Sequence, residues 1–196
     1  MPERRCLRWV WLAGVALVFP AFTAGNALAA PISAPLARSS DTTGQPPRLL
    51  VPVQGVSPEE VEDTYADQRV GGSRVHEALD IMAPRGTPVV AADDGRIVKL
   101  FLSKPGGITI YQFDASGRFA YYYAHLNAYA DGLAEGQQVR RGQVLGYVGS
   151  TGNANPDAPH LHFGIFRLDA EGRWWKGVPI NPFPYVRGLP LPVAPQ

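Results

Sequence analysis

Residues 107–126 read GITIYQFDASGRFAYYYAHL and contain two runs of β-branched and aromatic residues, joined by a polar turn from Asp114 to Gly117. Two such runs around a short turn are typical of paired antiparallel strands. Similar short runs lie on both sides of this stretch: TPVVAA (87–92), RIVKLFL (96–102), VLGYVG (144–149) and HLHFGIF (160–166). Short strands separated by glycine-rich turns predict an all-β fold made of antiparallel sheet.

The flanks of this strand-rich part have a different composition. Residues 30–47 are rich in Ala, Pro, Ser and Thr and are expected to form a flexible linker, so the folded domain should cover 48–187. The sequence Ser57-Pro58-Glu59-Glu60 resembles a helix start, which predicts at most a short helix before Gly71. The chain from Val178 onward is proline-rich and is expected to pack irregularly, with residues 188–196 as a tail.

Residues 1–29 have the features of a signal peptide. Three arginines precede an apolar stretch from Trp9 to Phe22, and Ala27-Leu28-Ala29 matches a cleavage site, so removal is expected before Ala30. The apolar stretch is shorter than the roughly 20 residues of a membrane span. Export to the periplasm, the cell wall or the extracellular space is therefore expected, without stable membrane insertion after cleavage. An uncleaved anchor is the alternative.

Charge and cysteine content narrow the class of protein further. The 196-residue chain has a net charge of +1, and removal of three arginines and one glutamate with the signal peptide leaves 15 basic and 16 acidic residues. Its basic residues are scattered, which argues against a nucleic-acid partner. Its only cysteine, Cys6, lies in the segment to be removed, so neither a disulfide nor a thiol nucleophile is expected.

All four histidines lie in three short motifs: His76 in HEALD (76–80), His125 in YAHL (123–126), and His160 and His162 in PHLHF (159–163). Side chains two or four positions apart in a strand point to the same face. His76 is therefore expected to share a strand face with Asp80, as is His160 with His162. Two such strands side by side would bring these side chains together.

This residue set is typical of a catalytic zinc site. Such a site usually has three protein ligands from imidazole and carboxylate groups and one open position for water. His76, Asp80 and His162 supply that set, and one zinc ion per chain would activate water and polarise a carbonyl for amide hydrolysis. His125 and His160 remain as the acid-base pair, because an imidazole with a pKa of about 6.5 can take up and return a proton near neutral pH.

A helical alternative exists for the first motif, because HEALD begins like the zinc-binding pattern HExxH. Asp80 stands where that pattern has its second histidine, and Pro84 follows soon after. The strand interpretation is therefore favoured.

These motifs resemble those of the lysostaphin-type (LytM-domain) zinc metallopeptidases, whose pattern is HxGxD followed by HxH. The resemblance covers roughly residues 48–186, including Gly149-Ser150-Thr151-Gly152 and Pro159. It implies a β-sandwich-like LytM domain (the duplicated hybrid motif), with zinc held by His76, Asp80 and His162 and catalysis by His125 and His160. Ala78 departs from the pattern, which usually has glycine there.

The resemblance implies an exported zinc metalloendopeptidase that hydrolyses peptide bonds in bacterial peptidoglycan, with peptidoglycan peptides as its partners. A D-alanine to diaminopimelate cross-link and a glycine bridge both remain open as substrates, as does an additional regulatory partner. A catalytically silent regulator of another cell-wall hydrolase is the alternative function. A third hypothesis, a lipoyl or phosphotransferase carrier, comes from VRRGQVLGYVG (139–149), but this hairpin lacks the lysine of lipoyl domains, and export argues against a phosphocarrier.

Aromatic side chains cluster at Phe119 and Tyr121–Tyr123. Such a run is usually core packing. The alternative is that the run lines a substrate groove, for which Tyr123 is the first candidate, because strand alternation predicts that it shares a face with His125.

Overall fold

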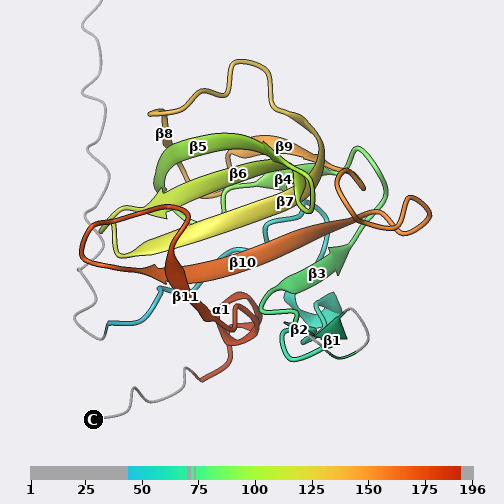
Figure 1. Ribbon diagram of the computed structural model, residues 1–196, viewed down its shortest axis with the longest axis horizontal. Coiled ribbons are helices and arrows are strands. Elements are labelled where there is room, and N and C mark those ends of the chain that lie inside the picture. The colour runs from blue at the N-terminus through green and yellow to red at the C-terminus, as the bar shows by residue number, and fades with distance from the viewer. Residues whose placement is uncertain (1–43, 70–71, 73, 191–196) are drawn as a thin grey trace, which may run out of the picture. The chain divides into compact units, whose positions relative to one another are not determined.

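The computed structural model describes residues 44–69, 72 and 74–190 (Figure 1). The expected signal peptide (1–29), the linker as far as residue 43 and the tail from residue 191 lie outside the described residues. The elements in chain order are η1 (Pro58–Glu60), β1 (Gln68–Arg69), β2 (Arg74–Val75), β3 (Leu79–Met82), β4 (Pro88–Val90), β5 (Gly95–Ser103), β6 (Gly107–Asp114), β7 (Phe119–Tyr129), β8 (Gln138–Val139), β9 (Val144–Val148), β10 (His160–Leu168), β11 (Gly177–Ile180) and α1 (Phe183–Arg187).

The described strands form one large antiparallel sheet and one small hairpin. The main path of the large sheet is β11-β10-β7-β6-β5-β8, with β3 paired to β10 and β9 paired to both β4 and β7 (Figure 1). The hairpin consists of β1 and β2. The all-β, antiparallel fold expected from the sequence is confirmed.

The long strands β7 and β10 each serve more than one neighbour. The first part of β7 pairs with β6 and β10, and its last part, from Leu126 to Tyr129, pairs with β9. Strand β10 begins beside β3, continues along β7 and ends beside β11 (Figure 1). Motifs that are far apart in the sequence therefore meet where β3, β10 and β7 lie side by side.

The core lies on one face of these strands. Tyr121, Tyr123, Phe163 and Ile165 are fully buried in it at alternating positions of β7 and β10. The Tyr123 hydroxyl donates to Gln112 Oε1 at 2.8 Å and accepts from the Ala92 backbone N–H at 3.0 Å. The favoured interpretation, core packing, therefore holds for Tyr123, and the alternative that it lines a groove is wrong, since its side chain is a hydrogen-bonded part of the core.

Two local expectations had different outcomes. The expected short helix after Ser57 is the single 3-10 turn η1, where Glu60 accepts from the Ser57 backbone N–H. The prediction of irregular packing from Val178 onward is wrong, because β11 pairs with β10 and α1 follows it. Pro179 occupies the edge strand β11, where a missing N–H is tolerated. Among the described helices, none has the length and apolar character needed to cross a membrane.

Candidate metal centre

Three side chains bring one ligand atom each to a common point. His76 Nε2 lies 2.9 Å from Asp80 Oδ1 and 3.0 Å from His162 Nδ1, and the Asp80 and His162 atoms lie 3.1 Å apart. These are the residues expected from the sequence to hold a metal, and the structure brings all three together.

The pairing of β3 with β10 puts two of the three ligands next to each other. Asp80 is the direct cross-strand partner of His162. Directly opposite residues of an antiparallel pair project to the same face with Cβ atoms about 5 Å apart. Strand register therefore fixes the carboxylate against the imidazole.

His76 reaches the site in a different way from that expected. It lies between β2 and β3 rather than in the strand of Asp80, and Glu77 beside it has a φ of 59°, in the left-handed region. The expectation that His76 and Asp80 share one strand is therefore wrong, since the chain bends between them. The helical HExxH alternative is also wrong, because this segment contains no helix.

The loop before β1 holds this bend in place. His76 Nδ1 lies 2.8 Å from the Thr64 carbonyl oxygen, and the Asp80 backbone N–H donates to Thr64 Oγ1 at 3.0 Å. Because a carbonyl oxygen can only accept, Nδ1 of His76 carries the proton. Its Nε2 is thus left with a lone pair that faces the other two ligands, an orientation common for metal-binding histidines.

The two remaining histidines lie at one side of the ligand cluster. The rings of His125 and His160 have centroids 5.1 Å apart, and His160 Nε2 lies 3.7 Å from Asp80 Oδ1. In each ring Nδ1 lies 2.8 Å from a backbone carbonyl, that of Thr151 for His125 and that of Ala158 for His160. As in His76, Nδ1 therefore carries the proton in both rings. The Nε2 atoms of His125 and His160 are left to exchange a proton.

His125 sits at an irregularity of β7. Its φ is 60°, a conformation that a residue other than glycine rarely adopts, and the β6–β7 register shifts between Ile108 and Ile110. Its N–H donates to the Gly106 carbonyl at 2.8 Å. The irregularity interrupts strict alternation, which explains why His125 contacts His162 while Tyr123 faces the core.

Glycine makes the close packing beside His125 possible. Gly152 has a φ of +78°, and a Cβ atom built there would lie 2.3 Å from the Pro105 carbonyl oxygen and 2.4 Å from the Gly107 nitrogen. The β5–β6 turn thus packs directly on the backbone of the loop that carries Thr151. This contact holds the carbonyl that orients His125.

Burial and mutual contacts set the ionisation of the site. Burial alone would raise the pKa of Asp80, but hydrogen bonds with His162 and His76 outweigh it and hold that pKa well below its ordinary value. Burial lowers the pKa of His162, and it lowers the pKa of His125 to about 4. At neutral pH these groups are therefore a carboxylate and two neutral imidazoles.

The donor set fits a zinc ion. Ligands of tetrahedral zinc at about 2.0–2.1 Å lie about 3.3 Å from one another. The observed triangle needs to widen by only about 0.3 Å to match that spacing. Two imidazoles and one carboxylate leave the fourth tetrahedral position open, as in catalytic zinc sites.

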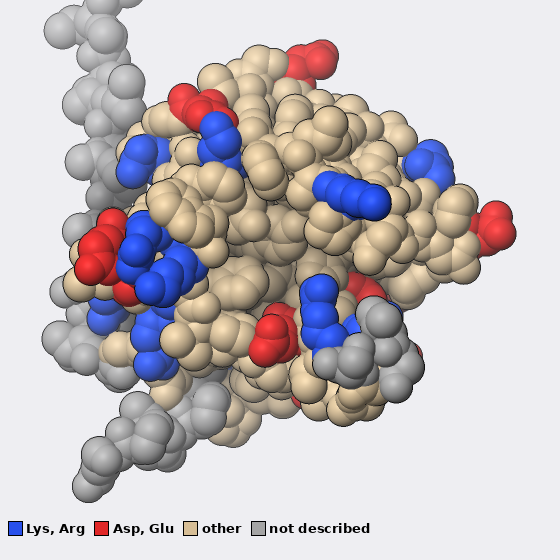
Figure 2. Space-filling view, viewed as in Figure 1, with Lys and Arg blue, Asp and Glu red and all other residues tan. Residues whose placement is uncertain are grey.

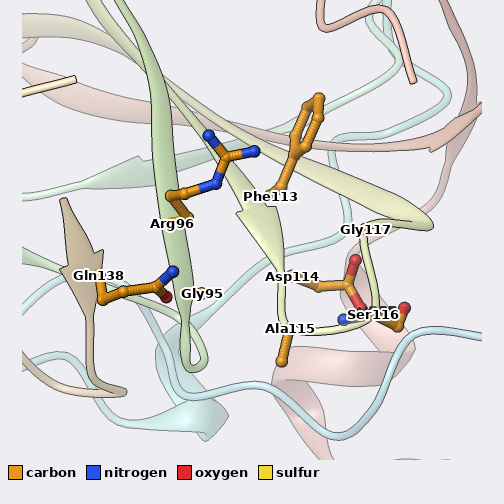
Figure 3. A pocket seen from close by; sticks show the side chains of 8 residues that line it. All are labelled: Gly95, Arg96, Phe113, Asp114, Ala115, Ser116, Gly117 and Gln138. Carbon is orange, nitrogen blue, oxygen red and sulfur yellow. Dashed lines mark hydrogen bonds between the residues drawn. The ribbon is translucent and has the colours of Figure 1, made fainter. Parts of the chain in front are cut away.

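The surface around the site is largely uncharged. Figure 2 shows a hollowed area over β7 and β10 in which tan side chains dominate, with Lys, Arg, Asp and Glu scattered around its rim. Tyr122 packs beside the ligand cluster, since its ring lies edge-on to His162 with centroids 5.9 Å apart. A separate polar depression lies beside Arg96, Asp114 and Gln138 (Figure 3), but the Asp114 carboxylate already accepts hydrogen bonds from Ser116 and Phe119.

Sequence reasoning missed four residues of this site. Thr64 and Thr151 orient histidines, Tyr122 packs on His162, and Arg69 donates a hydrogen bond to Asp80 Oδ2. The Gly149-Ser150-Thr151-Gly152 segment was noted in the sequence, but nothing in it indicated a backbone contact. Thr64 and Arg69 carried no motif signal in the sequence.

Comparison with other proteins finds relatives that are named as peptidases. The chain is 36% identical over 130 residues to an L-Ala--D-Glu endopeptidase of Bacillus subtilis, a match that covers 63% of this chain and 38% of the relative. It is 40% identical over 125 residues to the DD-carboxypeptidase/endopeptidase Mpg of Neisseria meningitidis, covering 63% of this chain and 25% of that protein. The chain thus matches well under half the length of each of these relatives.

A solved structure extends the likeness to the fold. The catalytic domain of lysostaphin from Staphylococcus simulans superposes with a TM-score of 0.55 at 30% identity, covering 65% of this chain and 91% of that domain. The sequence model described as Peptidase family M23 matches residues 74–182, which contain all three histidine motifs. Because this match spans more than half of the chain, the protein belongs to peptidase family M23.

Proposed function

We propose that this protein is a zinc endopeptidase that hydrolyses peptide bonds in peptidoglycan. In this proposal His76, Asp80 and His162 hold one zinc ion, and His125 and His160 exchange protons with the reacting groups. The observation that carries the proposal is the convergence of three ligand atoms within 3.1 Å of one another, beside two histidines whose Nδ1 atoms are occupied by backbone carbonyls.

The chain's own groups suit amide hydrolysis. When bound, zinc would supply Lewis acidity toward a carbonyl oxygen and lower the pKa of water. Near pH 7 His125 is neutral, since its pKa is about 4, so its Nε2 can accept a proton. His160 Nε2, 3.7 Å from a metal-binding oxygen, is close enough to exchange a proton with a substrate there. The backbone carbonyls of Thr151 and Ala158 hold both rings in the required tautomer.

Peptidoglycan peptides are the proposed substrates on the strength of the relatives. An L-Ala--D-Glu endopeptidase and lysostaphin are among the similar proteins, together with a DD-endopeptidase, ShyC, of Vibrio cholerae. The names L-Ala--D-Glu endopeptidase and peptidoglycan DD-endopeptidase specify different bonds, so family membership supports the polymer rather than one bond. Export, proposed from residues 1–29, would bring the protein to this polymer.

Digestion of purified sacculi tests the proposal. The zinc-loaded protein should release peptide fragments identifiable by mass spectrometry, and chelator-treated protein should release none until zinc is returned. Zinc binding without any fragment release would overturn the enzymatic role. Stimulation of another cell-wall hydrolase by the same inactive sample would then support the regulator. Secretion of a reporter fused to residues 1–32 tests export separately.

A further inference from the structure

Arg69 and the histidines of the site contact different oxygens of Asp80. Asp80 Oδ1 is the oxygen near His76, His160 and His162, whereas Asp80 Oδ2 accepts a hydrogen bond from the Arg69 guanidinium. One carboxylate therefore separates the ligand cluster from an arginine. The guanidinium therefore contacts the same side chain that is proposed to hold zinc and that lies 3.7 Å from His160 Nε2.

The guanidinium keeps donors for another partner. Arg69 comes from β1 of the small hairpin, and 40% of its side chain is exposed, compared with 16% for Asp80. A guanidinium has five N–H donors. Within the described part of the chain, the bond to Asp80 is the one hydrogen bond of the Arg69 side chain. The Arg69 Nε atom is buried and has no hydrogen-bond partner among these residues.

Charge around Arg69 favours an anion. Its cross-strand partner in the hairpin is Arg74, so two cations stand directly opposite each other, an arrangement that costs stability on its own. Among the described carboxylates, Asp80 alone forms an ion pair with Arg69. A zinc ion bound to Asp80 would neutralise part of the Asp80 charge, and the positive charge of Arg69 would then be less well balanced.

We propose that Arg69 forms a subsite for a free carboxylate on the substrate residue that supplies the scissile nitrogen. This inference rests on the proposed function and specifies its substrate class. Arginine binds carboxylates through paired, charge-assisted hydrogen bonds. One N–H of the guanidinium bonds Asp80, and the exposed part of the side chain is left for a second carboxylate beside the metal centre.

A free carboxyl group beside the scissile nitrogen distinguishes the candidate bonds. In an alanyl–glutamate bond, and in a cross-link to an amine of diaminopimelate, the residue that supplies the nitrogen has a carboxyl group on the carbon next to that nitrogen. Within a glycine bridge the corresponding group is part of the next amide and carries no charge. Arg69 therefore selects stem-peptide bonds with a free carboxylate over glycine bridges.

Matched peptides test the subsite. Each pair has the same sequence, with the carboxyl group next to the scissile nitrogen either free or converted to its amide. The zinc-loaded protein should cleave the free form with a kcat/KM about 10-fold to 100-fold higher, the range expected for a charge-assisted hydrogen bond. Arg69→Gln should bring the ratio of the two kcat/KM values to about one, because KM rises more for the free form than for the amidated form. This ratio compares two substrates of the same sample, so it does not depend on a change in zinc content.

Two further variants separate recognition from structure. Arg69→Lys keeps the charge and should retain part of the preference. Arg96→Gln makes the same charge change beside Phe113, at the far end of β6 from the turn that contacts His125, and should leave the preference unchanged. Thermal unfolding of each variant shows whether it is folded.

A binding measurement gives a readout that does not need catalysis. The amine-side cleavage product with a free carboxylate should bind the zinc-loaded protein in calorimetry, and Arg69→Gln should weaken this binding about 10-fold or more. Equal cleavage of free and amidated peptides, or an equal loss for both in Arg69→Gln, would overturn the subsite and leave Arg69 as a residue that positions Asp80. If neither peptide is cleaved, the proposed function fails, and product binding still decides the subsite.

Discussion

Asp80 and His162 face each other as a cross-strand pair of β3 and β10, with Asp80 Oδ1 3.1 Å from His162 Nδ1. The two residues are 82 positions apart in the sequence, and the sheet itself brings them together. The candidate metal centre is therefore built largely on regular sheet, which is more rigid than a loop. Its remaining ligand, His76, and its neighbour Arg69 come from the segment before β3.

Substitution of individual histidines should separate metal binding from proton transfer. His162→Ala removes a ligand atom and should reduce bound zinc well below one ion per chain. His125→Ala and His160→Ala leave all three ligand atoms in place, so zinc content should remain near one while cleavage falls about 100-fold or more. Metal analysis and a peptide cleavage assay on the same samples give both quantities. Loss of zinc in His125→Ala would assign that residue to the metal instead.

Zinc removal should also lower stability. The three ligand atoms converge only in the folded chain, so zinc binds the folded state preferentially. At a free zinc concentration 100 times the dissociation constant, this binding contributes about 2.7 kcal/mol. Thermal unfolding with and without a chelator should show a fall of several degrees that zinc reverses. An unchanged melting temperature would argue against a zinc site formed by these residues.

The metal-free protein should lose stability in mild acid. The pKa of His125 is about 4 in the folded state and about 6.5 when unfolded, so between these values only the unfolded state binds the proton. The free energy of unfolding should therefore fall as pH drops from 6.5 to 4, by at most about 1.4 kcal/mol per pH unit for this residue. His162, whose pKa is also lowered, acts in the same direction. Urea unfolding across this range should show a smaller slope for His125→Gln than for the unsubstituted protein.

Two buried tyrosines provide a matched test of the core. Tyr123→Phe removes the hydroxyl that bonds Gln112 and the Ala92 N–H and should cost about 1–3 kcal/mol, because both partners stay buried. The hydroxyl of Tyr121 is buried without a hydrogen-bond partner in the described structure, so Tyr121→Phe should cost little or increase stability. Urea unfolding measures both. Equal losses would show that the hydrogen bonds of the Tyr123 hydroxyl contribute no more to stability than the unpaired hydroxyl of Tyr121.

Two glycines with positive φ should differ in their tolerance of a methyl group. Gly117→Ala adds a Cβ in open space at a φ of +71° and should cost about 1 kcal/mol, for backbone strain alone. Gly152→Ala has a similar φ, but its Cβ would overlap the backbone at Pro105 and Gly107, so the loss should be clearly larger. It should also reduce cleavage, because the loop that holds Thr151 against His125 must shift. Similar losses for both variants would contradict the close packing of this loop.

The sequence alone determined the strand content, and it predicted the five candidate site residues that the structure brings together. Alternating apolar residues and glycine-rich turns record which segments are strands, because a sheet with one buried face requires them. The histidines could be grouped because chemistry restricts which side chains hold zinc.

Only the tertiary structure decided how those residues meet. Alternation predicted one strand for His76 and Asp80 and one face for Tyr123 and His125, and both predictions were wrong where a residue adopts a positive φ, at Glu77 and at His125. Such conformations occur in residues other than glycine only where packing and hydrogen bonds from distant segments compensate for the strain. The contributions of Thr64, Arg69 and Thr151 arise in the same way, from long-range contacts that leave no periodic pattern in the sequence.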